Sequence, residues 1–144
     1  MVGLTTVQAT AAPERLIIPK VGVNAPIVRV PVVGGKLMIG NSVDAVYRPR
    51  RDDPLCDPLG TSIIAGHTYR SGDGVADNWR NLRAGDTFRA GGCRFKVQYT
   101  VVRSGKFRIG HLMRADGPPR VVLIGCKPDD YSRRIMVFAR KVGR

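Results

Sequence analysis

The sequence is short of cysteine, histidine and aromatic residues, and it contains no apolar run long enough to cross a membrane. Its 144 residues include 3 Cys and 2 His, and 6% are aromatic. Three cysteines are too few for a disulfide-rich scaffold, and the aromatic residues do not cluster as a base-stacking platform would require. With 43% hydrophobic residues the chain can still bury a core. Disorder is therefore excluded, and one folded domain is expected.

Acidic residues are also scarce, and this gives the chain its most unusual property. Asp and Glu total 11 against 24 Lys and Arg, so the formal net charge is +13. A field of that sign favours an anionic partner, such as nucleic acid, an acidic membrane surface or a phosphate-rich polymer. The basic residues are scattered along the chain, without the polybasic arm that is typical of nucleic-acid tails. Charge alone does not choose among these partners.

Common catalytic and ligand-binding motifs are missing as well. The sequence contains no GxxxxGK[ST] loop, no GxGxxG after a strand, no HExxH and no GxSxG. The cysteines are far apart, whereas the ligands of a structural zinc site come in pairs about two to four residues apart. Nucleotide binding, metalloprotease chemistry, serine hydrolysis and structural zinc are therefore unsupported.

Short β-branched and aromatic runs separated by Gly, Pro and Asn predict an all-β fold. The clearest run covers residues 93–103, where Phe95, Val97, Tyr99 and Val101 recur at every second position, the period of a half-buried strand. Strands at this spacing favour a barrel or a sandwich over alternating βαβ units. The predicted strands cover residues 15–19, 25–33, 36–39, 61–65, 86–89, 93–103, 120–125 and 134–142.

The remaining segments are predicted to be irregular. Residues 1–13 are small and polar, so we expect a flexible linker before a single domain of residues 14–144. Residues 41–60 contain three prolines and several charges, which predicts a long surface loop. Trp79 and Leu82 follow a glycine-rich stretch and predict one helical turn packed on the sheet.

Three side chains are candidates for chemistry. Cys126 follows the apolar run 121–124 and precedes a polar loop, a place where a scaffold can present a thiol to a cleft, although a buried structural cysteine fits the same pattern. His67 also ends a strand-like run, whereas His111 has no strand before it. Arg134 opens the next strand, and the hairpin geometry predicts that it lies beside Cys126. An ordinary satisfied histidine and a solvated arginine are the alternatives.

Six segments follow one another in an ordered pattern: RLIIPKVGVNAPIV at 15–28, GTSIIAGHT at 60–68, WRNL at 79–82, AGD at 84–86, VVLIGC at 121–126 and RIMVFA at 134–139. In this order they resemble the sortase family, cysteine transpeptidases that attach proteins to the Gram-positive cell wall or to pili. The small size and the short loop after the cysteine suggest class F, with class E as the alternative.

The chain departs from the family's TLxTC pattern around the cysteine. Val122 and Gly125 stand where the family has threonines. The order and spacing of the preceding strand, Cys126 and the following strand that begins with Arg134 nevertheless match the family. Counting back five positions from Ala139, as the family's final strand suggests, identifies Arg134 rather than Arg133 as the family's arginine.

The resemblance implies a closed, sortase-like antiparallel or mixed β-barrel of seven to eight strands with one or two short helices. It also implies that Cys126 attacks the carbonyl carbon of a threonine and forms a thioester. His67 would then protonate the leaving amine and deprotonate the incoming one, and Arg134 would hold the substrate carbonyl or the oxyanion. The residues expected to form the floor of the substrate groove are Ala65, Thr68, Leu123 and Ile124.

The implied substrates are an LPxTG-like sorting-signal peptide and an amine of a peptidoglycan precursor or a pilin. The family works at the extracellular face of the plasma membrane or in the cell wall of Gram-positive bacteria. It is held there by an N-terminal membrane anchor, which we expect to be missing from this chain. We expect a monomer without a nucleic-acid partner.

No cofactor is expected. Some sortases bind calcium through acidic loop residues, but Asp52, Asp53 and Asp57 follow Arg50 and Arg51, which favours local ion pairs, and calcium is not predicted.

A sortase works outside the cell, where disulfides persist. A bond between Cys56 and Cys93 would leave Cys126 as the single free thiol that the mechanism needs.

Two other interpretations of the sequence stay open. One is a noncatalytic basic β-barrel that binds an anionic polymer or nucleic acid and uses Cys126 structurally. The other is a cysteine peptidase that uses the same three residues but passes the acyl group to water.

Overall fold

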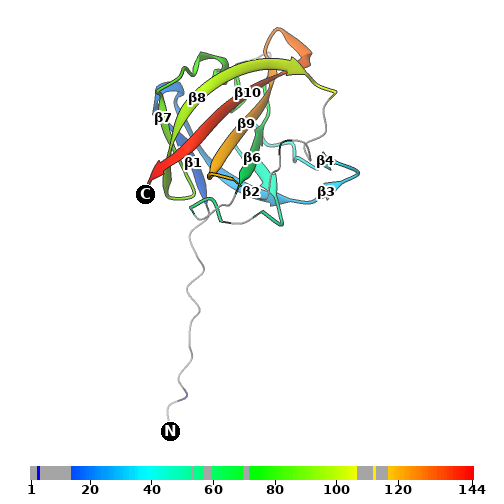
Figure 1. Ribbon diagram of the computed structural model, residues 1–144. Coiled ribbons are helices and arrows are strands. Elements are labelled where there is room, and N and C mark those ends of the chain that lie inside the picture. Colours follow the sequence, from blue (N-terminus) through cyan, green and yellow to red (C-terminus); the bar gives the residue numbers. More distant parts are fainter. Residues whose placement is uncertain are drawn as a thin grey trace.

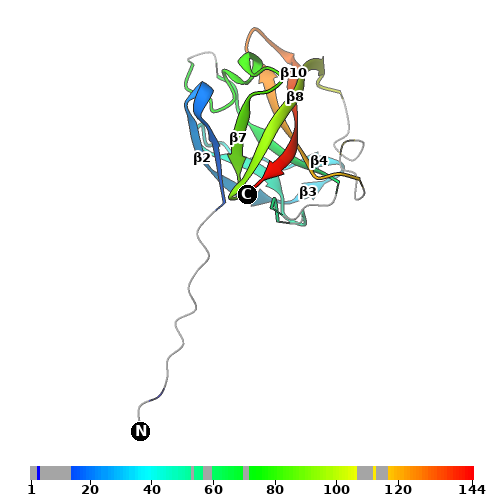
Figure 2. The same ribbon diagram turned by 60° about the vertical axis from the view of Figure 1, so that its left-hand side comes forward.

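The computed structural model describes residues 3, 14–52, 54–56, 60–69, 72–106, 112 and 117–144. Within these residues eight strands close into a barrel, in the order β1-β2-β5-β6-β9-β10-β8-β7 (Figures 1 and 2). The predicted all-β closed barrel is confirmed. The strands are β1 (Arg15–Ile18), β2 (Val23–Val30), β3 (Val32–Val33), β4 (Lys36–Leu37), β5 (Val46–Pro49), β6 (Thr61–Gly66), β7 (Thr87–Ala90), β8 (Cys93–Ser104), β9 (Arg120–Lys127) and β10 (Asp130–Gly143).

The barrel is mixed rather than purely antiparallel. β2 pairs with β5 in parallel, and β6 pairs with β9 in parallel, whereas the other neighbours are antiparallel. A separate hairpin of β3 and β4 projects from the connection between β2 and β5 (Figure 1). Two short 3₁₀ turns, η1 (Pro19–Val21) and η2 (Trp79–Asn81), are the helices of the described residues. None of these residues forms a helix with the length and apolarity to traverse a bilayer.

Alternation along β9 divides the apolar residues into two regions. Val121 and Leu123 point into the barrel, where they pack in one buried cluster with Trp79. Val122 and Ile124 point to the outer face, where a second cluster of Ile63, Met136 and Phe138 is covered by Leu37, Val101 and Leu112. Burying each large aliphatic side chain contributes about 1.5 to 3 kcal/mol. Both faces of β9 are therefore buried. Because side chains alternate along the strand, its even-numbered residues lie on the outer face.

The predicted loop over residues 41–60 is partly wrong, because β5 lies inside it. All four residues of β5 are buried, including Arg48. Arg48 donates to Glu14 over 3.2 Å and lies 3.9 Å from Asp52. Burial lowers the pKa of Arg48 from its ordinary value, while the carboxylate of Glu14 opposes that change. A buried charge satisfied by a residue far away in sequence has no local signature, so the strand was missed.

Other predicted boundaries need smaller corrections. The predicted strand over residues 25–33 is broken at Pro31, which separates β2 from the hairpin. β10 begins at Asp130 rather than at Arg134. The expected linker over residues 1–13, apart from Gly3, and the candidate His111 lie outside the described residues.

A disulfide joins Cys56 to Cys93, with a Cα–Cα distance of 5.3 Å. It ties the segment after β5 to the first residue of β8 across a sequence separation of 37 residues. In the chain-entropy model, closing a loop of this length contributes about 4 kcal/mol of stability. All three cysteines are among the described residues, and Cys126 is the free one.

Candidate active site

Cys126 and Arg134 are direct neighbours across the β9–β10 ladder, in which they are register partners. Partners in an antiparallel ladder have Cα atoms about 4.5 to 5.5 Å apart, and their side chains lie on the same face. Both residues are half-buried on the outer face. Arg133 points to the opposite face by strand alternation. The sequence candidates Cys126 and Arg134 are thus brought together.

His67 lies on the other side of Cys126, at the end of β6. The parallel β6–β9 ladder pairs Thr61 with Arg120 and continues in step to Ala65 and Ile124. Extending this register by two residues along both chain segments places His67 alongside Cys126. The hydroxyl of Thr68 donates to the carbonyl oxygen of Cys126 over 2.8 Å, which keeps the two strand ends adjacent beyond the ladder.

A backbone carbonyl orients the imidazole of His67. Nε2 of His67 lies 2.5 Å from the carbonyl oxygen of Gly40, and the rings of Tyr47 and Tyr69 lie 6.2 and 5.6 Å from the imidazole. A carbonyl oxygen only accepts hydrogen bonds, so Nε2 must carry a hydrogen. In the neutral imidazole this leaves Nδ1 as the nitrogen with a free lone pair.

Tyr47 holds the turn that presents this carbonyl. Its hydroxyl accepts a hydrogen bond from the backbone N–H of Ser42 over 3.0 Å. A Cβ atom on Gly40 would lie 2.8 Å from the same hydroxyl oxygen, so glycine is needed for the turn to pack this closely. Tyr47 stands opposite Ala65 in the β5–β6 ladder. Sequence reasoning missed Gly40 and Tyr47, because β5 was predicted to be loop and a backbone acceptor leaves no residue signature.

The guanidinium of Arg134 is anchored at one end. Its Nη1 atom donates to the carbonyl oxygens of Tyr131 over 2.6 Å and Arg133 over 3.2 Å. A Cβ atom on Gly105 would lie 3.0 Å from Nη1, so the guanidinium packs closely against that glycine. These contacts fix one edge of the planar guanidinium group. Its other N–H groups make no hydrogen bond to a described residue.

The four predicted floor residues divide between two faces. Ala65 and Ile124 lie on the outer face with Cys126, and the hydroxyl of Thr68 is engaged by the Cys126 carbonyl. Leu123 instead points into the barrel and has 0% exposure, so it cannot contact a ligand on the outer face. The apolar run 121–124 is buried on both faces and hides the alternation that separates Leu123 from its neighbour.

Packing explains why glycine precedes the cysteine. A Cβ atom on Gly125 would lie 2.7 Å from Cβ of Ala76 and 3.5 Å from both Oγ1 of Thr68 and Cε3 of Trp79. Ala76 and Trp79 therefore fill the space that a side chain at position 125 would need.

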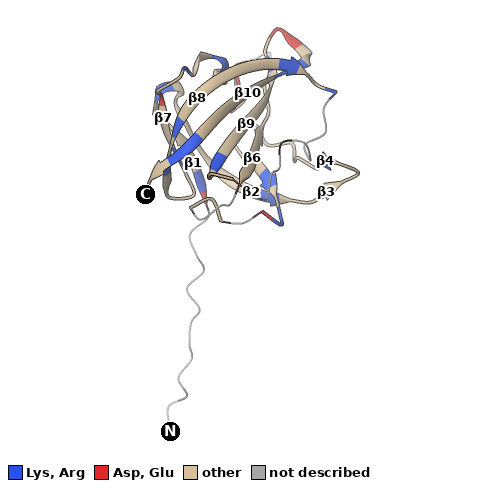
Figure 3. Ribbon diagram, viewed as in Figure 1, with Lys and Arg blue, Asp and Glu red and all other residues tan. Residues whose placement is uncertain are grey.

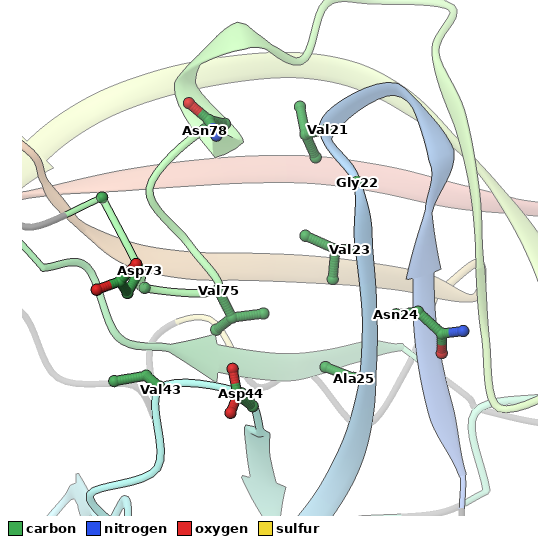
Figure 4. Close-up of a pocket in the computed structure, with 12 residues that line it drawn as sticks. Val21, Gly22, Val23, Asn24, Ala25, Val43, Asp44, Asp73, Val75 and Asn78 are labelled. Carbon is green, nitrogen blue, oxygen red and sulfur yellow. The ribbon is translucent and has the colours of Figure 1, made fainter.

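A cavity of about 240 Å³ lies between β2 and residues 72–78, and none of these three residues lines it (Figure 4). Its lining includes Val21 and Val75, with the carboxylates of Asp44 and Asp73 at one side (Figure 4). Neither this cavity nor any other part of the described chain gathers three or more His, Cys, Asp or Glu side chains that suit a metal ion. Of the aspartates considered for calcium, Asp53 and Asp57 lie outside the described residues.

Comparisons with known proteins agree on one family. The family model of the sortase domain matches residues 16–142. Sortase C-1 from Actinomyces oris is 24% identical with a TM-score of 0.73, and the match covers 90% of this chain and 72% of that one. Sortase A from Listeria monocytogenes is 17% identical with a TM-score of 0.71, covering 92% and 88% respectively. A search of curated protein sequences finds no match. At these identities the structural likeness shows a shared fold.

Proposed function

Because the chain belongs to the sortase family and is a cysteine transpeptidase, we propose that Cys126, His67 and Arg134 are its catalytic residues. The observation that carries this proposal is the register of three neighbouring strands. β9 carries the thiol between the imidazole at the end of β6 and the guanidinium of β10. Sortases act on LPxTG-type sorting signals and amine acceptors.

In the first half-reaction the thiol of Cys126 gives its proton to Nδ1 of His67, and the resulting thiolate attacks the carbonyl carbon of the threonine in the sorting signal. The peptide bond after the threonine breaks, and His67 gives a proton to the departing amine. The product is a thioester between Cys126 and the threonine. Nδ1 is the imidazole nitrogen left for this transfer, since Nε2 is engaged by Gly40.

In the second half-reaction an amine replaces the sulfur. His67 takes a proton from the incoming amine, the amine nitrogen attacks the thioester carbonyl, and the carbon–sulfur bond breaks to return the thiolate of Cys126. Arg134 stabilises the oxyanion in both tetrahedral intermediates, a task for which its planar fork is better suited than a lysine ammonium. Water at the same carbonyl gives slow hydrolysis.

We further infer a substrate groove on the outer face, floored by Ala65 and Ile124. The acceptor is an amine of a peptidoglycan precursor or a pilin, and the chain acts at the cell surface of a Gram-positive bacterium. Its small size supports class F, with class E as the alternative. The single free thiol supports a thioester mechanism in an oxidising compartment.

The decisive assay follows a fluorogenic LPxTG peptide with and without an amine acceptor. We expect cleavage, and in the presence of the amine we expect a new amide product at the expense of hydrolysis. A scrambled peptide of the same composition is the control. Cleavage that ignores the amine would identify a hydrolytic peptidase, and no cleavage of any LPxTG variant would leave a noncatalytic module.

The contact between Gly40 and His67 gives a sharper test. We expect Gly40→Ala to reduce kcat/KM about 10- to 100-fold, because the new Cβ would displace the turn from Tyr47 and withdraw its carbonyl from the imidazole. Nitrogen-15 spectra of the imidazole should show the Nε2–H tautomer in the unchanged protein and a mixture of tautomers in the variant.

The single variant Tyr47→Phe measures the loss of the Ser42 hydrogen bond alone, and against that reference the double variant Gly40→Ala/Tyr47→Phe removes the nearest clashing atom. It should recover part of the lost activity while the melting temperature changes little. Full activity and an unchanged tautomer in Gly40→Ala would show that the turn does not position His67.

A further inference from the structure

Five basic side chains gather at the end of the barrel opposite Cys126. We call them the basic row. Arg140 of β10 is the register partner of Lys96 on β8 and of Arg120 on β9, so three cations stand side by side across three strands. The next strand pair adds Arg94 opposite Arg89. Figure 3 shows the corresponding blue bands across neighbouring strands.

The basic row faces outward. Its members alternate with interior residues such as Phe88, Phe95, Val97, Val121 and Ala139. Arg89, Arg94, Lys96 and Arg140 are exposed, and Arg120 is half-buried. Arg120 and Arg140 lie six positions along their strands from Cys126 and Arg134, which corresponds to about 20 Å. A ligand on the basic row would therefore leave the thiol accessible.

Among the described residues, no acidic side chain forms an ion pair with the basic row. The ion pairs of the described residues connect other cations, namely Lys20, Arg29, Arg48 and Lys127, to carboxylates. Like charges directly opposite each other destabilise a sheet. The basic row therefore carries a repulsion that a bound anion would relieve.

A cavity at one end of the row can seat such an anion. It has a volume of about 350 Å³ and is lined by Arg120 and Arg140 together with Thr61, Gln98 and Pro118. Nε of Arg120 donates to Oγ1 of Thr61 over 2.6 Å, and its guanidinium carbon lies 5.6 Å from the ring centre of Phe138. These contacts fix the guanidinium plane, while its Nη atoms bond to no described residue. A fixed arginine fork matches phosphate oxygens in geometry.

We propose that the basic row binds a linear polyol phosphate polymer, a phosphodiester chain without nucleobases, because the row holds no aromatic side chain on which bases could stack. One phosphate would occupy the Arg120–Arg140 cavity, and the next ones would lie along Lys96, Arg94 and Arg89. Neighbouring strands are about 4.8 Å apart, so the charges follow the curved wall of the barrel. A flexible polymer can follow that curve, whereas a flat bilayer touches it at few points. Thr87 is the next ladder partner of Lys96, and it offers no apolar side chain for insertion into lipid.

The test measures binding of the full chain to a labelled poly(glycerol phosphate) at several salt concentrations. The double variant Lys96→Gln/Arg140→Gln should bind at least about tenfold more weakly, and the slope of log Kd against log salt should fall by about 1.4. The matched control Lys36→Gln/Arg51→Gln removes two exposed cations elsewhere and should stay within about twofold. Equal losses in the two variants would show diffuse charge attraction and overturn the proposal.

Three further probes separate other partners. Polyglutamate, vesicles containing 30% anionic phospholipid and a single-stranded oligonucleotide should each bind more weakly than the polymer at equal charge concentration. Equal or tighter binding of any of them would replace the polyol phosphate polymer as the partner and overturn the proposal. In low salt the Lys96→Gln/Arg140→Gln variant should melt at the same or a higher temperature, and it should cleave the LPxTG peptide normally. A lower melting temperature would show that the basic row serves the fold, and would overturn the proposal.

Discussion

Cys126→Ala is expected to reduce kcat/KM for the LPxTG peptide about 10⁴-fold or more, because no thioester can form without the sulfur. Neither of the other cysteines can replace it, since Cys56 and Cys93 are bonded to each other. Intact-protein mass spectrometry should find the acyl adduct on the unchanged chain and none on the variant. The melting temperature should change little, because Cys126 is half-buried at a strand end.

The double variant Cys56→Ala/Cys93→Ala is the informative companion. It should keep the acyl adduct but melt at a lower temperature, because it loses the link between residues 37 positions apart. The two cysteine variants thus separate chemistry from stability. Cleavage or an acyl adduct that survives in Cys126→Ala would remove this residue from the mechanism.

Arg134→Lys is expected to lower kcat about 10²- to 10³-fold with a smaller change in KM. The lysine keeps the charge but loses the planar fork that we assign to the oxyanion, and single oxyanion donors have effects of this size. It also loses the Nη1 contacts with the carbonyls of Tyr131 and Arg133 that orient the side chain. Steady-state kinetics with the fluorogenic peptide give both constants.

Arg133→Lys is the matched control, because the adjacent arginine points to the opposite face of β10. It should stay within about twofold of the unchanged protein. A large loss in Arg133→Lys together with a small one in Arg134→Lys would reverse the assignment of the two arginines.

Sequence patterns predicted best the strands whose own residues show which side chains are buried, without reference to distant partners. In β8 the alternation of Phe95 and Val97 with charged residues is a property of the strand itself, and the apolar run of β9 is long enough to need burial on both faces. β5 is different, because the burial of Arg48 depends on Glu14, 34 residues away. No window of sequence around β5 contains that partner.

The candidate site divides in the same way. The proximity of Cys126 and Arg134 could be predicted, because one ends a strand and the other lies at the same end of the next strand of the hairpin. The face of the sheet on which each residue lies was harder to predict. Leu123 and Ile124 were both predicted as floor residues, because their apolar run shows no alternation, whereas Leu123 packs inside the barrel. The carbonyl of Gly40 belongs to the backbone, and its approach to His67 depends on the packing of Tyr47. Only the folded chain reveals such a contact.

The parallel pairing of β6 with β9 also affects how this protein is made. Thr68, which follows His67, meets Cys126 across 58 residues of sequence. Contacts of such long range form slowly, because the entropy of closing the intervening chain is lost before the pairing is gained. In an unfolded chain the thiol of Cys126 is therefore present before His67 packs beside it, and the proposed mechanism requires the barrel to close before the chain can cleave a peptide.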